Sequence, residues 1–121
     1  MKSKEEIIEI EIAEIDLYII NKARELRVAR KMSQLKLSIA LNLAEGAVSK
    51  IENPKQRAKY NIRHINLLAK ALKCNPADLV PPKPLKNDVI RAKLKITRNP
   101  KDRKGEPNYV VISKVPVKNH D

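Results

Sequence analysis

The sequence of 121 residues contains no tryptophan or phenylalanine, only three tyrosines and two glycines, and a single cysteine. Because Cys74 is alone, an internal disulfide framework and a cysteine metal cluster are both excluded. No apolar run approaches the ~20 residues that a membrane-spanning helix needs, and the first residues do not form a signal peptide. Hydrophobic residues still make up 42% of the chain, mostly as aliphatic side chains, which argues against a disordered basic tail. We therefore expect a soluble intracellular protein with an aliphatic core.

Acidic residues are also few: 14 Asp and Glu stand against 26 Lys and Arg, which gives a net charge of +12. The charge is uneven, because residues 1–30 carry 6 basic and 7 acidic side chains, whereas residues 31–80 carry 9 and 3 and residues 81–121 carry 11 and 4. An excess of positive charge most often indicates a polyanionic partner. We expect that partner to contact the chain beyond residue 30.

Three prolines among residues 81–84 divide the chain, since they cannot continue a helix and favour an extended connector. The sequence predicts an N-terminal strand or arm at 1–14, a helical domain at 15–80, a Pro-rich linker at 81–87 and a β-hairpin arm at 88–118.

The segment before the prolines has helical periodicity. Asp16, Ser33 and Asn61 are candidate N-caps of three helices that end near Lys31, Leu41 and Leu72. A further helix is predicted from about Glu45 to Glu52, after a tight turn at Asn42, and a fifth begins at Pro76. The side chains expected to face inward are Ile19, Ala23, Leu26, Leu37, Leu41, Val48, Ile51, Ile65, Leu68, Ala69, Leu72 and Leu79. The predicted fold class is therefore mainly α, with five short helices.

Residues 34–53, QLKLSIALNLAEGAVSKIEN, resemble the helix-turn-helix of Cro- and lambda-repressor-like regulators of the xenobiotic-response-element type. The preceding ARELRVARKMSQ resembles the first helix of that family, and LLAKALKCNPADLV resembles the fourth and fifth helices. The resemblance covers roughly residues 17–80. It implies a five-helix lambda-repressor-like domain that places the helix from about Glu45 to Glu52 in the major groove of duplex DNA.

The same resemblance assigns residue roles. Gln34 matches a position that touches phosphate and sometimes a base edge, and Asn53, Lys55 and Arg57 match a loop that holds the DNA backbone. Arg27 and Glu52 match a structural pair that joins the first helix to the recognition helix. The outward positions of the recognition helix are Ala44, Glu45, Gly46, Ser49 and Lys50.

Side-chain chemistry suggests how these positions would act. Lys50 can bond guanine N7 and O6, and a carboxylate such as Glu45 can accept from the cytosine amino group. Lys50 can equally be a solvated helix lysine, and relatives often carry Arg, Gln or Lys where this chain has Glu45. Gly46 either permits close approach to the groove or reflects a tolerant first turn. Lys36 and Lys59 are expected to add phosphate contacts to those of Lys55 and Arg57.

Outside the helical domain the apolar period changes to two. Ile8 to Ile12 alternates Ile with Glu, and Ile90 to Thr97 alternates apolar with mostly basic residues. A turn-rich stretch at 99–108 then leads to a second run at 109–115, which predicts a hairpin with one basic face, although residues 87–95 could instead form a short helix. The acidic strand is a suitable mate for the basic one, either within one chain or across a dimer.

Several residues point away from enzyme chemistry. His64 and His120 are too isolated for a metal site or a catalytic base, two glycines cannot make a phosphate-binding loop, and Cys74 is expected to fill the core. We expect no enzyme activity, no cofactor and no metal. Leu35 and Ile39 form an apolar pair on the outer face of the second helix, which a terminal arm or a partner could cover.

Together these features predict a cytoplasmic, nucleoid-associated transcriptional regulator that binds double-stranded DNA as a homodimer on an inverted repeat and acts as a repressor. The alternative is an antitoxin-type protein that docks on a toxin through Leu35 and Ile39 or the terminal arms and autoregulates its operon. In a third hypothesis the basic hairpin itself contacts DNA through Arg91, Lys93 and Lys95.

Overall fold

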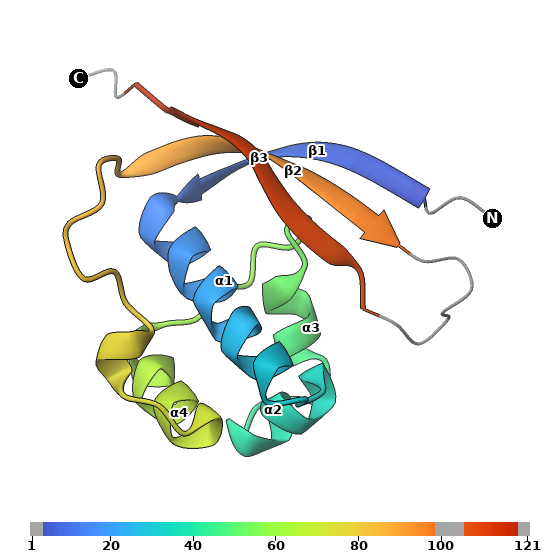
Figure 1. Cartoon of the computed structure of the whole chain (residues 1–121), viewed down its shortest axis with the longest axis vertical. Coiled ribbons are helices and arrows are strands. Elements are labelled where there is room, and N and C mark those ends of the chain that lie inside the picture. Colours follow the sequence, from blue (N-terminus) through green and yellow to red (C-terminus); the bar gives the residue numbers. More distant parts are fainter. Residues whose placement is uncertain (1–3, 99–105, 119–121) are drawn as a thin grey trace. The chain divides into compact units, whose positions relative to one another are not determined.

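The computed structural model describes residues 4–98 and 106–118 and divides the chain into two units (Figure 1). One unit is the continuous stretch 14–86, and the other joins the two terminal segments, up to Ala13 and from Asn87. His120 and most of the loop predicted at 99–108 lie outside the described residues. In the part of the chain that is described, no helix has the length and apolar character needed to cross a membrane.

Four α-helices build the first unit: α1 (Glu14–Ala29), α2 (Gln34–Ala40), α3 (Ala47–Glu52) and α4 (Ile62–Leu72). A 3-10 turn, Pro76–Asp78, follows α4. The core is aliphatic apart from one tyrosine, as the shortage of aromatic residues requires. Its buried members are Leu17, Ile20, Ala23, Leu37, Leu41, Val48, Ile51, Tyr60, Ile65, Leu68, Ala69, Leu72 and Leu79.

The prediction of a mainly α fold with five helices is wrong on both counts. Pro76 begins only a three-residue 3-10 turn, which ends where the Leu79 N–H donates to the Pro76 carbonyl at 3.1 Å. The side chain of Leu79 is fully buried. The chain then enters Pro81 and Pro82, where a helix cannot continue. The second unit is a three-stranded sheet, so the protein combines helices with strands in separate units.

Helix ends follow local chemistry where a side chain can cap them. Ser33 accepts the Lys36 N–H at 3.0 Å, and Asn42 adopts a left-handed φ of 58° in the turn after α2. Asn61 accepts the His64 N–H at 3.1 Å, while His64 Nδ1 accepts the Asn61 N–H at 2.9 Å. These caps confirm the predicted starts of α2 and α4.

The prediction for α1 needs correction. The helix begins at Glu14, so Asp16 lies in its first turn, where its charge favours the helix dipole, and does not cap it. The buried stripe runs through Leu17, Ile20, Ala23 and Arg27, whereas Ile19 and Leu26 are only half-buried. The predicted buried face of α1 is rotated from the observed one because a pattern of apolar residues does not include the buried Arg27.

The sheet has the order β1-β2-β3, formed by β1 (Lys4–Ala13), β2 (Val89–Arg98) and β3 (Asn108–Pro116), all antiparallel. The structure therefore has a strand where a helix at 87–95 was the alternative, and β1 pairs with β2 within one chain. Ile8, Ile10 and Ile12 oppose Leu94, Ala92 and Ile90, so one face is apolar.

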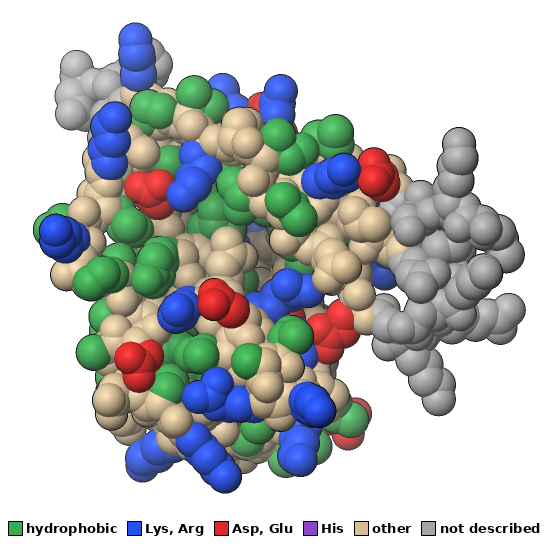
Figure 2. Space-filling model, viewed as in Figure 1, with side chains coloured by type: hydrophobic (Ala, Val, Ile, Leu, Met, Phe, Trp, Pro, Cys, Tyr) green, Lys and Arg blue, Asp and Glu red, His purple; other side chains and the backbone are tan. Residues whose placement is uncertain are grey.

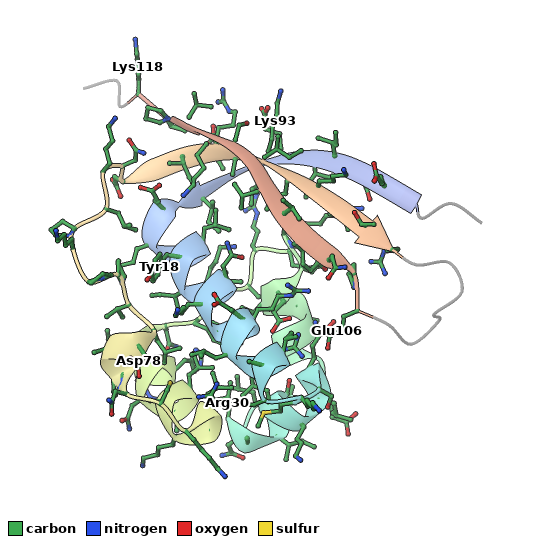
Figure 3. The ribbon with its side chains drawn as sticks, viewed as in Figure 1. Tyr18, Arg30, Asp78, Lys93, Glu106 and Lys118 are labelled. Atoms are coloured by element: carbon green, nitrogen blue, oxygen red, sulfur yellow. The ribbon has the colours of Figure 1, made fainter. Side chains whose placement is uncertain are left out.

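The opposite face of the sheet carries charges of both signs. Arg91 Nη2 lies 2.8 Å from Glu11 Oε1, and Arg91 Nε lies 3.6 Å from Glu9 Oε1. Lys95 Nζ lies 3.3 Å from Glu5 Oε1, and Lys93, which projects from the exposed face of β2 in Figure 3, is the cross-strand neighbour of Glu9. The acidic strand β1 therefore offsets much of the positive charge of β2, although such exposed pairs add little stability.

Candidate nucleic-acid interface

Helices α2 and α3 are joined by a tight turn that the backbone closes by itself. The N–H groups of Leu41, Asn42 and Leu43 bond the carbonyls of Leu37, Ile39 and Ser38 at 2.9 Å each. Leu37, Leu41 and Val48 are fully buried between the two helices and the rest of the unit. The outer side of α3 is thereby held exposed on a rigid support.

Ser38 on α2 fixes the start of α3. Its buried hydroxyl donates to the Gln34 carbonyl at 2.9 Å and accepts the Val48 N–H at 3.0 Å. Gly46, the residue before α3, has no side chain to cap the helix, so Ser38 replaces the missing N-cap with a side chain from the neighbouring helix. Sequence reasoning missed this residue. The available signal was a small hydroxyl residue beside the inward-facing Leu37.

Replacing Ser38 with alanine should lower the free energy of unfolding by about 1–3 kcal/mol, because the buried Val48 N–H loses its acceptor. Urea denaturation of the purified protein measures this change. Ser49→Ala is the matched control, since Ser49 lies exposed on α3 and its loss should change stability by less than about 0.5 kcal/mol. Equal stability of the two variants would contradict the assigned role of Ser38.

Arg27 and Glu52 form a buried bidentate pair between α1 and the end of α3. Arg27 Nε and Nη2 donate to Glu52 Oε2 and Oε1 at 2.8 and 2.7 Å, and each side chain is only 1% exposed. The third guanidinium nitrogen, Arg27 Nη1, donates to the Met32 carbonyl at 2.7 Å in the loop between α1 and α2. One pair thus joins α1, α3 and the entry to α2.

Glu52 also contacts α2 directly. Gln34 Nε2 donates to Glu52 Oε1 at 3.1 Å, and Arg24 Nε lies 3.7 Å from the same oxygen. Burial, and next the charge of Glu52, raise the pKa of the nearby Tyr60, so its phenol stays neutral. Gln34, a residue predicted to contact the DNA backbone, is therefore bonded to the last residue of α3.

The five predicted groove positions are exposed, but three of them precede the helix. Helix α3 begins at Ala47, two residues later than predicted, so Ala44, Glu45 and Gly46 belong to the turn. Gly46 has an ordinary φ of −90°, and a Cβ added there would meet no atom within 4 Å. The helix-interior cost of glycine therefore does not apply, and the space beside Gly46 is open. Ser49 and Lys50 lie exposed on α3 itself.

A hollow of about 290 Å³ lies beside these positions. Its lining is mainly apolar, from Ala44, Gly46 and Ala47 to Ala58, with Lys50 and His64 as its basic members. Small side chains at the start of α3 thus leave open space beside the backbone.

The loop after α3 presents the predicted phosphate-contacting residues. Asn53 Oδ1 accepts the Lys55 N–H at 3.0 Å, and the Asn53 carbonyl accepts the Gln56 N–H at 2.9 Å, which shapes the start of the loop. Lys55 and Arg57 are exposed and Lys59 is half-buried. Figure 2 shows a separate group of Lys and Arg side chains at the end of the helical unit where α2 and α4 lie, whereas the loop leaves α3 at its other end (Figure 1).

His64 has a structural place in this region. Its neutral Nδ1 is the acceptor of the α4 capping box, and burial, with a smaller effect of Arg63, lowers its pKa below the ordinary 6.5. Cys74 is half-buried, so it does not fill the core as predicted, and burial raises the pKa of its thiol.

We expect the protein to lose stability as the pH falls below 6.5, the ordinary pKa of histidine. The unfolded chain then binds a proton at His64 more readily than the folded chain, in which the protonated ring cannot accept from Asn61. Urea midpoints measured between about pH 7.5 and 5 test this. His64→Gln, which keeps an acceptor but does not titrate, should remove the decline. An unchanged decline in that variant would assign it to another group.

Two helices joined by a tight turn, the second with an exposed outer side and a basic loop after it, define a helix-turn-helix DNA-binding unit. The sequence profile of the Cro/C1-type HTH DNA-binding domain matches residues 23–84, about half of the chain. The chain therefore belongs to this family, as its sequence resemblance predicts. Comparisons with curated proteins and with solved structures gave no match.

Proposed function

We propose that this protein is a sequence-specific regulator of transcription that represses by occupying a promoter as a homodimer on an inverted repeat. The observation that carries the proposal is the set of exposed positions 44–46, 49 and 50 on the helix-turn-helix of a DNA-binding family. One helical unit presents one α3, and a palindromic operator requires two of them. Such a protein acts on DNA in the cytoplasm.

Few polar side chains are available to recognise bases. In the proposed complex Lys50 bonds a guanine edge and Glu45 accepts from a cytosine amino group. Ala44 and Gly46 offer no polar side-chain atom, and Ser49 offers one hydroxyl. The protein then reads part of its site through the shape and deformability of the DNA.

The DNA backbone is held by residues that flank α3 on both sides. Gln34 and Lys36 on α2, and Asn53, Lys55, Arg57 and Lys59 after α3, contact phosphates in this proposal. We further propose that residues 15–80 are the DNA-binding domain, that 81–87 is a linker, and that the strands within 1–14 and 88–118 form a separate dimerisation unit.

Selection of binders from a random duplex pool at near-physiological salt tests the proposal. A symmetric motif with half-sites about one helical turn apart is expected. Glu45→Ala and Lys50→Ala should each relax the preference at one base position without abolishing binding. Duplexes that are bound without any enriched motif would contradict sequence-specific regulation.

One observation favours a second function, that of an antitoxin-type protein with a toxin partner. Leu35 and Ile39 are 48% and 64% exposed on α2, an unusual pair of apolar side chains on one outer face. If they dock on a partner, Leu35→Ser/Ile39→Ser should abolish complex formation with the product of a neighbouring reading frame and leave DNA affinity within about twofold. Unchanged complex formation would reject this surface.

A further inference from the structure

Gln34 is held in place by a buried charge before any ligand arrives. Its Nε2 donates to Glu52 Oε1 at 3.1 Å, and the Glu52 side chain is 1% exposed. Glu52 is in turn fixed by two hydrogen bonds from Arg27, at 2.8 and 2.7 Å. The amide of Gln34 is therefore the outermost, half-buried member of a rigid chain of side chains.

The chemistry of Glu52 also decides which way the amide faces. A carboxylate only accepts hydrogen bonds, so the NH₂ group of Gln34, not its carbonyl, must face Glu52. One N–H is used in that bond, and the second N–H is the group that remains for another acceptor. Phosphate oxygens are acceptors too, so a phosphate would also be bound by the NH₂ group of Gln34 and not by its carbonyl oxygen.

We infer that Glu52 is a positioning residue for DNA binding: it orients Gln34 so that the free amide N–H meets a backbone phosphate at the start of α2. This inference rests on the proposed function. Glu52 does not touch DNA itself, and its effect passes through Gln34. Preorganisation lowers the cost of ordering a long polar side chain on binding, and a misoriented amide would present its carbonyl oxygen to a phosphate.

The consequence is coupling between the two ends of the helix-turn-helix. Glu52 is the last residue of α3 and Gln34 is the first residue of α2. A bond between them fixes a backbone contact in relation to the recognition helix that reads the bases. Arg57, an exposed residue of the loop beyond α3, serves as the comparison.

A double-mutant cycle in DNA binding tests the inference. The probe is a labelled duplex of about 25 base pairs, either enriched by the native protein or of random sequence, and affinity is measured by fluorescence anisotropy. Gln34→Ala and Arg57→Ala are each made in the native chain and in the variant Arg27→Met/Glu52→Leu. That background removes the acceptor for Gln34 and both charges of the Arg27–Glu52 pair together. It also removes the carboxylate near Arg24, so thermal unfolding is used to establish that the variant is folded.

In the native chain, Gln34→Ala should weaken binding about tenfold, as expected for the loss of a hydrogen bond to a charged group. In the Arg27→Met/Glu52→Leu background the same substitution should cost less than about twofold, whereas Arg57→Ala should cost the same in both backgrounds. A merely structural role of the pair would change affinity overall but leave the cost of Gln34→Ala unaltered.

Three results would overturn the inference, and they are distinguishable. Equal costs of Gln34→Ala in both backgrounds would remove the positioning role while leaving DNA binding intact. No effect of Gln34→Ala in the native chain, with Arg57→Ala still harmful, would remove Gln34 from the interface. Failure of the native protein to bind any duplex would reject the proposed function itself.

If the Arg27→Met/Glu52→Leu variant does not fold, Glu52→Asp provides the second background. The shorter side chain keeps the negative charge near Arg27 but withdraws the carboxylate from Gln34. The same reduced cost of Gln34→Ala is expected there, and an unreduced cost overturns the inference.

Discussion

Glu52→Ala should lower the free energy of unfolding by about 3–5 kcal/mol, because it leaves the Arg27 guanidinium buried without its carboxylate. Arg27 is 1% exposed, and two of its nitrogens donate to Glu52. Gln34 loses its acceptor at the same time. Equilibrium denaturation in urea measures the effect, and a loss of this size can abolish folding of a small domain.

The double variant Arg27→Met/Glu52→Leu is the informative control. Replacing both partners with apolar side chains of similar volume removes the buried charges together, so most of the stability should return. Glu25→Ala, which removes an exposed carboxylate from α1, should change stability by less than about 0.5 kcal/mol. A cost below about 1 kcal/mol for Glu52→Ala would show that water or another acceptor compensates Arg27.

Elements with local signals could be predicted from the sequence. Helix α4 combines a capping residue, Asn61, with an apolar stripe through Ile65, Leu68 and Leu72, and the structure has both features. The segment from Ile8 to Ile12 in β1 and the segment from Ile90 to Thr97 in β2 alternate strictly, and opposite charges on the two strands meet as expected. In each case the residues that define the element are neighbours in the sequence or share one simple period.

The wrong predictions concern elements whose boundaries or buried face depend on residues outside the element itself. Whether the segment after Asn75 becomes a helix depends on how far it can run, and Pro81 stops it after one turn. The start of α3 is set by a serine ten residues earlier, because Val48 N–H bonds Ser38 and not a local cap. The phase of α1 depends on Arg27, which is buried only because Glu52 lies opposite.

The candidate site divides in the same way. The family resemblance placed Gln34, Lys50 and the basic loop on one motif, and the structure keeps them on α2, on α3 and just after it. The bond between Gln34 and Glu52 spans 18 residues and joins two side chains that no periodicity relates. Only the folded arrangement could show that a residue expected to touch DNA rests on a buried carboxylate.

Replacing Lys55, Arg57 and Lys59 together with glutamine should weaken DNA binding about 10²- to 10³-fold at roughly 0.1 M salt. Each lost phosphate contact removes about 0.9 from the slope of log affinity against log salt, so the slope should fall by about 2.7. Binding of a labelled duplex measured over a range of salt concentrations gives both quantities. A slope close to that of the native protein would show that this loop does not hold the DNA backbone.

The sheet offers a control with the same change in charge. Glutamine at Arg91, Lys93 and Lys95 also removes three positive charges, but Arg91 and Lys95 already pair with Glu11 and Glu5, and Lys93 faces Glu9 across the strands. These cations release few counterions from DNA if β1 already offsets them, so the slope should stay within about 1 of the native value. A fall equal to that of the loop variant would show that β2 gives up its carboxylate partners for phosphates. The sheet would then be a second DNA-contacting surface.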